Sequence, residues 1–234
     1  MKLYIMNTTP LLHMLKRACA LLEISRKAHV EEIKLDSKKV QSIGAGLLLL
    51  YELYQREEER ELEGGSMSAE PIMVEAENVI CLLESLPAEK LALLQEKAAC
   101  RNEENGKPYF ADSSNGYLSI SHSEEYAVCA FSEMPLGVDI QKIKKIDREK
   151  VAKRLLHPAE PVNLYEDETL FFTYWAIKEA YVKKTGQGLS KDFRELFVSF
   201  LDDRTGCVKD EKTKENAKMH LYHAPDGYVL VTVS

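Results

Sequence analysis

The chain has 234 residues, of which 45% are hydrophobic and 29% charged, and this ordinary globular composition excludes a collagenous, disordered or disulfide-stapled protein. The length is enough for one large or two small domains with a buried core. The net charge of −7 argues against a nucleic-acid partner, since a phosphate backbone is bound by clustered Lys and Arg. A local basic patch would still accommodate a small phosphorylated ligand.

The N-terminal part of the chain is predicted to be mainly helical. Pro10 follows two threonines in a helix-start pattern, after which apolar residues recur at helical spacing. Asp36 is a candidate cap for a long helix that ends in an acidic run before a Gly-Gly-Ser loop. The expected elements are a strand over 2–7, helices over 11–22 and from 36 through 60, a loop at 64–66, and one or two helices over 71–99 with a boundary at Pro87.

Short strands dominate the rest of the chain. They are expected within 106–123, at 127–131 and 136–140, and near 196–203, 218–224 and 227–234. A basic helix follows residue 140, and a second helix over 168–184 is expected to end at Gly186. Strands separated by helices and joined in hairpin-like pairs favour an α+β fold over a doubly wound sheet.

The cysteines and the N-terminal segment indicate a reduced, cytoplasmic protein. Five cysteines occur without a CxxC pair and among apolar neighbours, so we expect reduced core residues and no zinc site. Polar residues and a proline interrupt residues 1–22, which therefore lack the apolar core of a signal peptide. The longest apolar run, over 45–51, is too short to span a bilayer, so we expect no membrane association.

Asp139 and Gln141 form the first candidate site. They project from one face of the 136–140 strand, whose other face is apolar. One interpretation is a half-exposed strand with polar side chains facing water. The other makes Asp139 an oxygen ligand for Mg²⁺, which prefers one or two carboxylates together with phosphate oxygens and water. Both interpretations stay open at this point.

Glu179 and Lys183 form the second candidate site, because helical spacing places them on one face of the 168–184 helix. The alternative is a surface ion pair, with Glu four residues before Lys, worth only tenths of a kcal/mol. Trp175 on the same helix is expected in the core.

Two further polar motifs are ambiguous when taken singly. Gly106-Lys107-Pro108 is typical of a turn before a strand, and His122 stands between two serines at a strand end. His157, which precedes a proline, is equally compatible with an ordinary loop. None of these residues indicates a function by itself.

The order and spacing of these motifs closely resemble the Sfp-type (surfactin-synthetase-activating) 4'-phosphopantetheinyl transferases. The matching segments, which run from Gly106 to Leu189, are GKPYF, LSISHSEEYAVCAF, LGVDIQ, HPAE and FFTYWAIKEAYVKKTGQGL. The combination of GVDI with WxxKEAxxKxxGxGL is specific to the family. Weaker resemblance reaches back to about Arg26 and forward through the terminal strands.

The resemblance implies two similar α+β halves related by a pseudo-twofold, with the active site in the cleft between them. Here the halves would be residues 1–134, with the coenzyme A nucleotide contacts, and residues 135–234, with the metal strand and the WxxKEAxxK helix. A helical insertion at about 64–101 is longer than the family's usual connection. Because the site would lie within one chain, we expect a monomer.

The resemblance also implies an activity. It is the Mg²⁺-dependent transfer of the 4'-phosphopantetheine arm of coenzyme A to a serine hydroxyl of an apo acyl or peptidyl carrier protein, which releases 3',5'-ADP. The implied metal ligands are Asp139, Gln141 and Glu179, and the implied catalytic residues are Glu179 as the base and Lys183 at the pyrophosphate. The implied coenzyme A contacts are Lys27, Lys34, Lys39, Gly106, Lys107, Pro108, Ser121 and His122, with Lys107 and His122 near the 3'-phosphate. Glu160 matches another acid near the metal.

One departure from the family pattern keeps an alternative function open. The family commonly reads GVDIE, whereas this chain has Gln141, so the site would carry one less negative charge. A non-catalytic module that binds coenzyme A or a nucleotide with the same fold is therefore the alternative. An α+β interaction protein whose motifs are accidental is a third, remoter alternative.

A basic segment indicates where a partner would bind. Lys142 to Arg154 contains seven Lys or Arg and two acids, directly after the proposed metal strand. This segment has an ordinary explanation as a solvated helix face. Because the carrier proteins of this family are typically acidic, we expect Lys144, Lys145 and Arg148 to contact the carrier.

Overall fold

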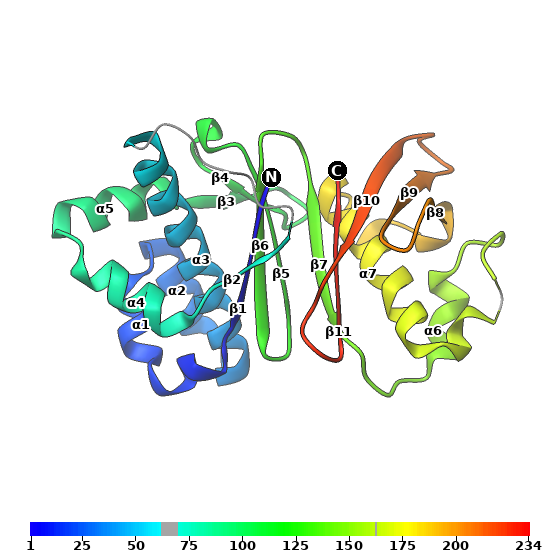
Figure 1. Cartoon of the computed structure of the whole chain (residues 1–234), viewed down its shortest axis with the longest axis horizontal. Helices are drawn as coiled ribbons and strands as arrows, with labels where there is room; N and C mark the ends of the chain where they lie inside the picture. Colours follow the sequence, from blue (N-terminus) through cyan, green and yellow to red (C-terminus); the bar gives the residue numbers. More distant parts are fainter. Residues whose placement is uncertain (62–69, 162) are drawn as a thin grey trace. The chain divides into compact units, whose positions relative to one another are not determined.

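The computed structural model describes residues 1–61, 70–161 and 163–234, and this part of the chain forms seven α-helices and three β-sheets (Figure 1). The mixed α+β class is therefore confirmed. The chain divides into two compact units, which are residues 1–102 with 108–133 (unit 1) and residues 103–107 with 134–234 (unit 2). The expected insertion at about 64–101 falls partly outside the described residues, because 64–69 belong to the segment between the first two ranges.

Unit 1 has a helical layer in which the helix α3 is the longest element. The helices are α1 (Leu15–Leu21), α2 (Ile24–Glu32), α3 (Asp36–Glu61), α4 (Ala76–Ser85) and α5 (Ala88–Lys97). Asp36 begins α3 and Pro87 caps α5, so these predicted start signals are confirmed. The helix expected over 11–22 is interrupted, because a 3₁₀ turn over Thr9–His13 precedes α1.

The sheet of unit 1 has the strand order β2-β1-β6-β5. Its strands are β1 (Lys2–Asn7), β2 (Ile72–Met73), β5 (Tyr117–Ser123) and β6 (Tyr126–Ser132), and a separate hairpin pairs β3 (Cys100–Asn102) with β4 (Pro108–Phe110). The helices lie on one face of the larger sheet (Figure 1).

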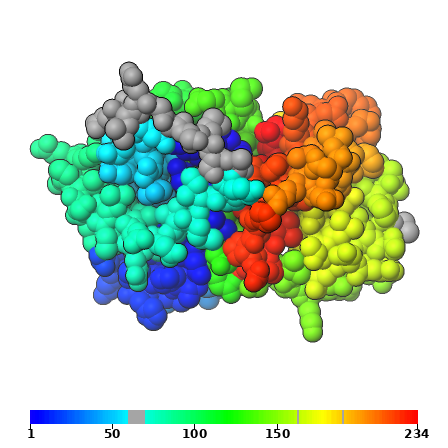
Figure 2. All heavy atoms as spheres, in the orientation of Figure 1, coloured from blue at the N-terminus to red at the C-terminus, as the bar shows by residue number. Residues whose placement is uncertain are grey.

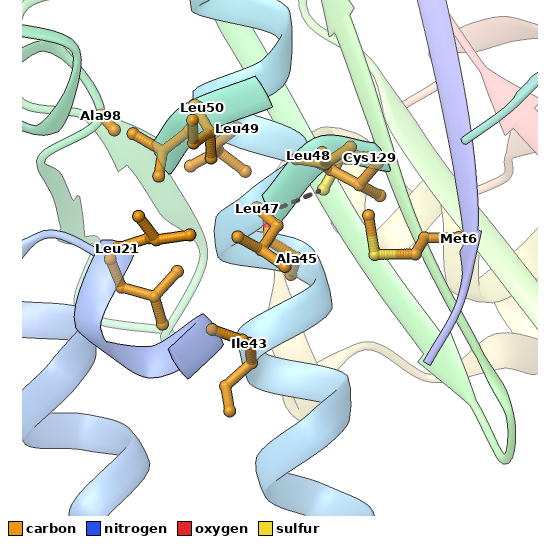
Figure 3. Close-up of a cluster of buried hydrophobic side chains, with 14 of the residues drawn as sticks. Met6, Leu21, Ile43, Ala45, Leu47, Leu48, Leu49, Leu50, Ala98 and Cys129 are labelled. Carbon is orange, nitrogen blue, oxygen red and sulfur yellow. Dashed lines mark hydrogen bonds between the residues drawn. The ribbon is translucent and has the colours of Figure 1, made fainter. Parts of the chain in front are cut away.

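The core of unit 1 lies on both sides of α3. Figure 3 shows its leucines between Met6 and Cys129 on the sheet side and Leu21 and Ala98 on the helical side. The Cys129 thiol contacts the carbonyl oxygen of Ala45 at 3.7 Å and is fully buried, so it is a core residue, as expected from its apolar neighbours. The same expectation is wrong for Cys81, which is exposed.

Unit 2 consists of a five-stranded antiparallel sheet and two helices. The sheet order is β7-β11-β10-β9-β8, with β7 (Gly137–Lys142), β8 (Leu196–Phe200), β9 (Thr205–Asp210), β10 (Asn216–Tyr222) and β11 (Tyr228–Val233). The helices are α6 (Arg148–Leu155) and α7 (Glu168–Thr185). The helix α7 packs against β7 and β11, which pair directly. In Figure 2 the orange and red atoms of the C-terminal strands lie beside the yellow-green α6 region of the same unit.

The sequence-based expectation does not include α2, β2, β3 or β9. The short strand β2 lies within 71–99, where helices were expected, and β3 directly follows that segment. The elements α2 and β9 have few buried apolar side chains: Val30 is the buried residue of α2, and Gly206, Val208 and Asp210 are the buried residues of β9. Over the described ranges, none of the helices combines the length and the apolar character needed to cross a membrane.

Candidate functional site

Asp139 lies at the centre of the candidate site, on strand β7. The strand pairs with β11, where Asp139 lies opposite Val231, and the Asp139 side chain is buried. Its Oδ1 accepts a hydrogen bond from Lys183 Nζ at 2.6 Å, and its Oδ2 accepts one from Gln141 Nε2 at 2.9 Å. Asp139 and Gln141 thus share a face, as predicted, but the interpretation of Asp139 as a solvated strand residue is wrong.

The second half of the site comes from α7, which is buried on most of its surface. Trp175, Glu179 and Lys183 follow one another at four-residue spacing and are half-buried, so they form one stripe along the helix. Lys183 makes its ion pair with Asp139 across 44 residues of chain. Lys183 therefore has a partner outside its own helix, and its charge also acts on Glu179.

The environment of Glu179 changes its acidity. Burial raises the pKa of Glu179 above its ordinary value of 4.5, and the negative charge of Asp139 raises it further. The Lys183 charge and the Trp175 side chain act in the opposite direction. Trp175 packs on Phe171 and Phe172, as expected of a core residue, but its contact with Glu179 was not anticipated from the sequence. The four-residue spacing of Trp175 and Glu179, which places them on one face of the helix, is the sequence feature that could have indicated this contact.

The donor set of this cluster fits Mg²⁺. Two carboxylates, Asp139 and Glu179, and the Gln141 amide offer the hard oxygen atoms that this ion prefers. Across the described residues, no three His, Cys, Asp or Glu side chains form a metal-ligand cluster.

Glu160, which the resemblance associates with the metal, has a different set of partners. It is buried, and its carboxylate accepts hydrogen bonds from Lys178 Nζ at 2.7 Å, from the Val198 backbone at 2.9 Å and from the His157 backbone at 2.8 Å. Lys178 is also buried, and burial lowers its pKa. These contacts favour a structural role for Glu160 inside unit 2 over a role beside the metal.

Gly106 and Lys107 lie in unit 2, at the C-terminal end of α7. The Lys107 ammonium donates to the carbonyl oxygen of Lys184 at 2.7 Å. Gly106 adopts a φ of +88° within a turn, as the Gly-Lys-Pro sequence predicted. The segment is therefore close in the fold to the helix that carries Glu179 and Lys183.

The remaining expected coenzyme contacts belong to unit 1. Lys27 and Lys39 both line a cavity of about 550 Å³ among α1, α2 and α3, together with Lys16 and Glu31. Lys34 is exposed and is not among the residues that line this cavity. On the sheet, Ser121 is buried and His122 is exposed, and Pro108 begins β4.

The basic segment after β7 divides into exposed and engaged residues. Lys144 and Lys145 are exposed. Arg148 instead forms an ion pair with Glu168 and donates from Nε to the Tyr165 carbonyl oxygen at 2.9 Å. Arg148 therefore links the start of α6 to the start of α7, and its guanidinium is less available for a partner than Lys144 and Lys145.

Comparison with known proteins identifies the region that contains this cluster. Residues 135–233 match the 4'-phosphopantetheinyl transferase superfamily. This match covers less than half of the chain. The matched region includes both β7 and α7, so every member of the Asp139 cluster lies inside the transferase match.

The chain is also similar in sequence to individual 4'-phosphopantetheinyl transferases. The chain is 30% identical over 131 residues to the 4'-phosphopantetheinyl transferase Sfp of Bacillus subtilis (strain 168). These matched residues cover 54% of this chain and 58% of that protein. It is 33% identical over 143 residues to the 4'-phosphopantetheinyl transferase gsp of Aneurinibacillus migulanus, with 59% of both chains covered. The chain is 36% identical over 99 residues to the 4'-phosphopantetheinyl transferase HetI of Nostoc sp., and the match covers 38% of this chain and 42% of that protein. The chain thus spans less than two thirds of the length of these relatives.

Proposed function

We propose that the protein transfers the 4'-phosphopantetheine arm of coenzyme A to a serine hydroxyl of an apo acyl or peptidyl carrier protein and releases 3',5'-ADP. The observation that carries the proposal is the buried Asp139–Lys183 ion pair beside Glu179, within the region that matches the transferase superfamily. The named relatives are transferases of this kind, which supports the same reaction here.

In the proposed reaction the serine oxygen forms a bond to the phosphorus that carries the pantetheine arm. The pyrophosphate bond to 3',5'-ADP breaks, and the serine proton passes to Glu179 or to a water molecule that Glu179 holds. The Glu179 carboxylate supplies the proton acceptor that a weakly nucleophilic serine hydroxyl needs.

The cluster would bind Mg²⁺ through carboxylate oxygens of Asp139 and Glu179 and through the amide oxygen of Gln141. When bound, the ion would supply positive charge beside the phosphate oxygens, where electrostatic stabilisation is the main source of catalysis. Lys183 lies within 2.6 Å of Asp139 and would add its ammonium to the charge that faces the pyrophosphate.

The coenzyme contacts implied by the family resemblance are part of this proposal. Lys27 and Lys39 are supported by their shared cavity, whereas Lys34, Ser121, His122, Pro108 and Gly106 rest on the resemblance alone. The resemblance is also the basis for the pseudo-twofold relation of the halves 1–134 and 135–234 and for the cleft between them. The monomeric state and the cytoplasmic location are expectations from the sequence. Lys107 is the exception, because its ammonium donates to the carbonyl oxygen of Lys184.

An acidic carrier protein would bind the basic segment after β7. Lys144 and Lys145 are exposed and closely follow Asp139 in the chain, so their charge would lie near the proposed metal site. Complementary charge mainly raises the rate of association. Arg148 is a weaker candidate, because its guanidinium already pairs with Glu168.

The alternative function is a non-catalytic module that binds coenzyme A, and Gln141 is the observation that favours it. The missing negative charge would weaken Mg²⁺ binding. Intact-mass measurement of a panel of apo carrier proteins, after incubation with the protein, coenzyme A and Mg²⁺, separates the two functions. A gain of one phosphopantetheine on a carrier supports the transferase, and binding of coenzyme A without any gain supports the module.

A further inference from the structure

Residues Glu103–Lys107 form a small turn that is closed by its own hydrogen bonds. The turn lies between β3 and β4 in the chain but groups with unit 2. The backbone NH of Gly106 donates to the carbonyl oxygen of Glu103 at 2.9 Å. The backbone NH of Glu103 donates to the carbonyl oxygen of Lys107, also at 2.9 Å. The NH of Lys107 also donates to Asn105 Oδ1 at 3.0 Å. The turn therefore presents the side chains of Asn105 and Lys107 in a fixed arrangement.

Both side chains bind the C-terminal end of α7. Lys107 Nζ donates to the Lys184 carbonyl oxygen at 2.7 Å, and Asn105 Nδ2 donates to the Gly186 carbonyl oxygen. The last carbonyl groups of a helix have no partner within the helix and carry its partial negative charge. An ammonium and an amide are suitable partners for these groups, so the turn caps the helix from outside.

Gly186 allows this close approach. It adopts a φ of +69°, the left-handed conformation that ends many helices. A Cβ atom at this position would lie 2.7 Å from Glu103 Oε2 and 3.5 Å from Lys107 Cδ. The turn therefore packs directly on the glycine that ends α7.

We propose that Lys107 is a positioning residue, which fixes the last turn of α7 and through it the Lys183 ammonium. This inference rests on the proposed transferase function for its effect on activity, and it differs from the 3'-phosphate contact that the family resemblance implies for Lys107. Lys183 precedes Lys184 in the same helical turn, so movement of the Lys184 carbonyl displaces the Lys183 backbone. Lys107 is half-buried, so its side chain is packed in the fold at the end of α7.

The test compares two substrates, coenzyme A and 3'-dephospho-coenzyme A, with Lys107→Met, Lys107→Arg and Asn105→Ala. The control is Lys212→Met, because the Lys212 side chain is 72% exposed on the surface of unit 2. We expect Lys107→Met to lower kcat about tenfold on both substrates with little change in KM, as for loss of a hydrogen bond to a charged group. Asn105→Ala should act in the same direction, Lys107→Arg should recover most of the loss, and the control should match the parent.

Amide hydrogen exchange tests the same inference without any substrate. The amides of residues 183–186 should exchange about tenfold faster in Lys107→Met than in the parent, with no change in Lys212→Met. A loss confined to coenzyme A, with unchanged amide exchange and a raised KM, would overturn the inference in favour of a 3'-phosphate contact. Faster exchange with an unchanged kcat, at a temperature where all variants are folded, would reduce Lys107 to a structural cap. A parent without transferase activity would contradict the proposed function, whereas unchanged exchange would contradict the positioning role, so the two failures are distinguishable.

Discussion

Gly137 lies directly against the backbone of Ala180, so closely that a Cβ atom on Gly137 would come within 1.8 Å of the Ala180 carbonyl oxygen. This contact sets the distance between β7 and α7. Asp139 follows two residues later on the strand, and Glu179 and Lys183 flank Ala180 on the helix. The glycine of the GVDI motif therefore has a physical role, which is to bring the two halves of the cluster together.

Gly137→Ala should destabilise the protein and damage the site together. The added methyl group meets a backbone carbonyl, which cannot rotate away, so we expect a loss of about 2–3 kcal/mol and a fall in Tm of roughly 5–10 °C. Thermal unfolding measures the effect, with Ser199→Ala on an exposed position of β8 as the control. A Tm equal to that of the parent would mean that β7 and α7 are less tightly packed than described.

Trp175→Phe should move the acidic limb of the pH–rate profile. The pKa of Glu179 is raised above 4.5 by burial and by Asp139, so activity that needs the carboxylate should fall as the pH drops through this raised value. The Trp175 indole lowers the pKa of Glu179, and its removal should therefore shift the limb to higher pH. A shift to lower pH, or none, would contradict the contact between Trp175 and Glu179.

Lys178→Met should unfold the protein more readily, because it leaves the Glu160 carboxylate buried without its cation. Both side chains are at most 1% exposed, and loss of one member of such a pair costs about 3–5 kcal/mol. The double variant Lys178→Met/Glu160→Gln should recover part of this loss, because the amide still accepts from the backbone of Val198. Urea unfolding of the three proteins gives the comparison. Equal destabilisation of the single and double variants would show that the charge of Glu160 is not the cause.

Lys144→Glu/Lys145→Glu should slow the reaction with the carrier and leave the KM for coenzyme A unchanged. Loss of complementary charge should lower kcat/KM for an acidic carrier about tenfold at low salt, and added salt should shrink the difference. Lys212→Glu/Lys214→Glu is the matched control, since it makes the same charge change on two side chains that are 72% and 70% exposed and lie outside the basic segment. A carrier kcat/KM that is the same in the double variant and the control would reject this surface.

The sequence patterns predicted the elements with strong apolar periodicity and missed those without it. The helix α7 and its end at Gly186 were predicted from spacing and a stop signal, and α3 from its Asp36 start. The helix α2 was missed because Val30 is its one buried side chain, so it has no apolar stripe to detect. The strand β9 was missed because two of its three buried positions are Gly206 and Asp210, which do not resemble a hydrophobic strand.

The same limit applies to the candidate site. Strand alternation placed Asp139 and Gln141 on one face, and helical spacing did the same for Glu179 and Lys183. The ion pair between Asp139 and Lys183 joins residues 44 positions apart, and the contact of Lys107 with Lys184 spans 77. Only the packing of β7 and the 103–107 turn on α7 creates these contacts, so no local pattern could predict them.

A titration of the transfer rate against Mg²⁺ tests the central claim, that Asp139, Glu179 and Gln141 bind the ion, most directly. Rates measured by intact mass of the carrier should fall severely in Asp139→Ala and Glu179→Ala, because each loses a carboxylate ligand. Gln141→Ala should be milder, since water can replace a neutral ligand, and Gln141→Glu should lower the Mg²⁺ concentration for half-maximal rate by restoring a charge beside the cation. Near-parental rates and Mg²⁺ dependence in Asp139→Ala and Glu179→Ala would contradict the assignment of the metal site.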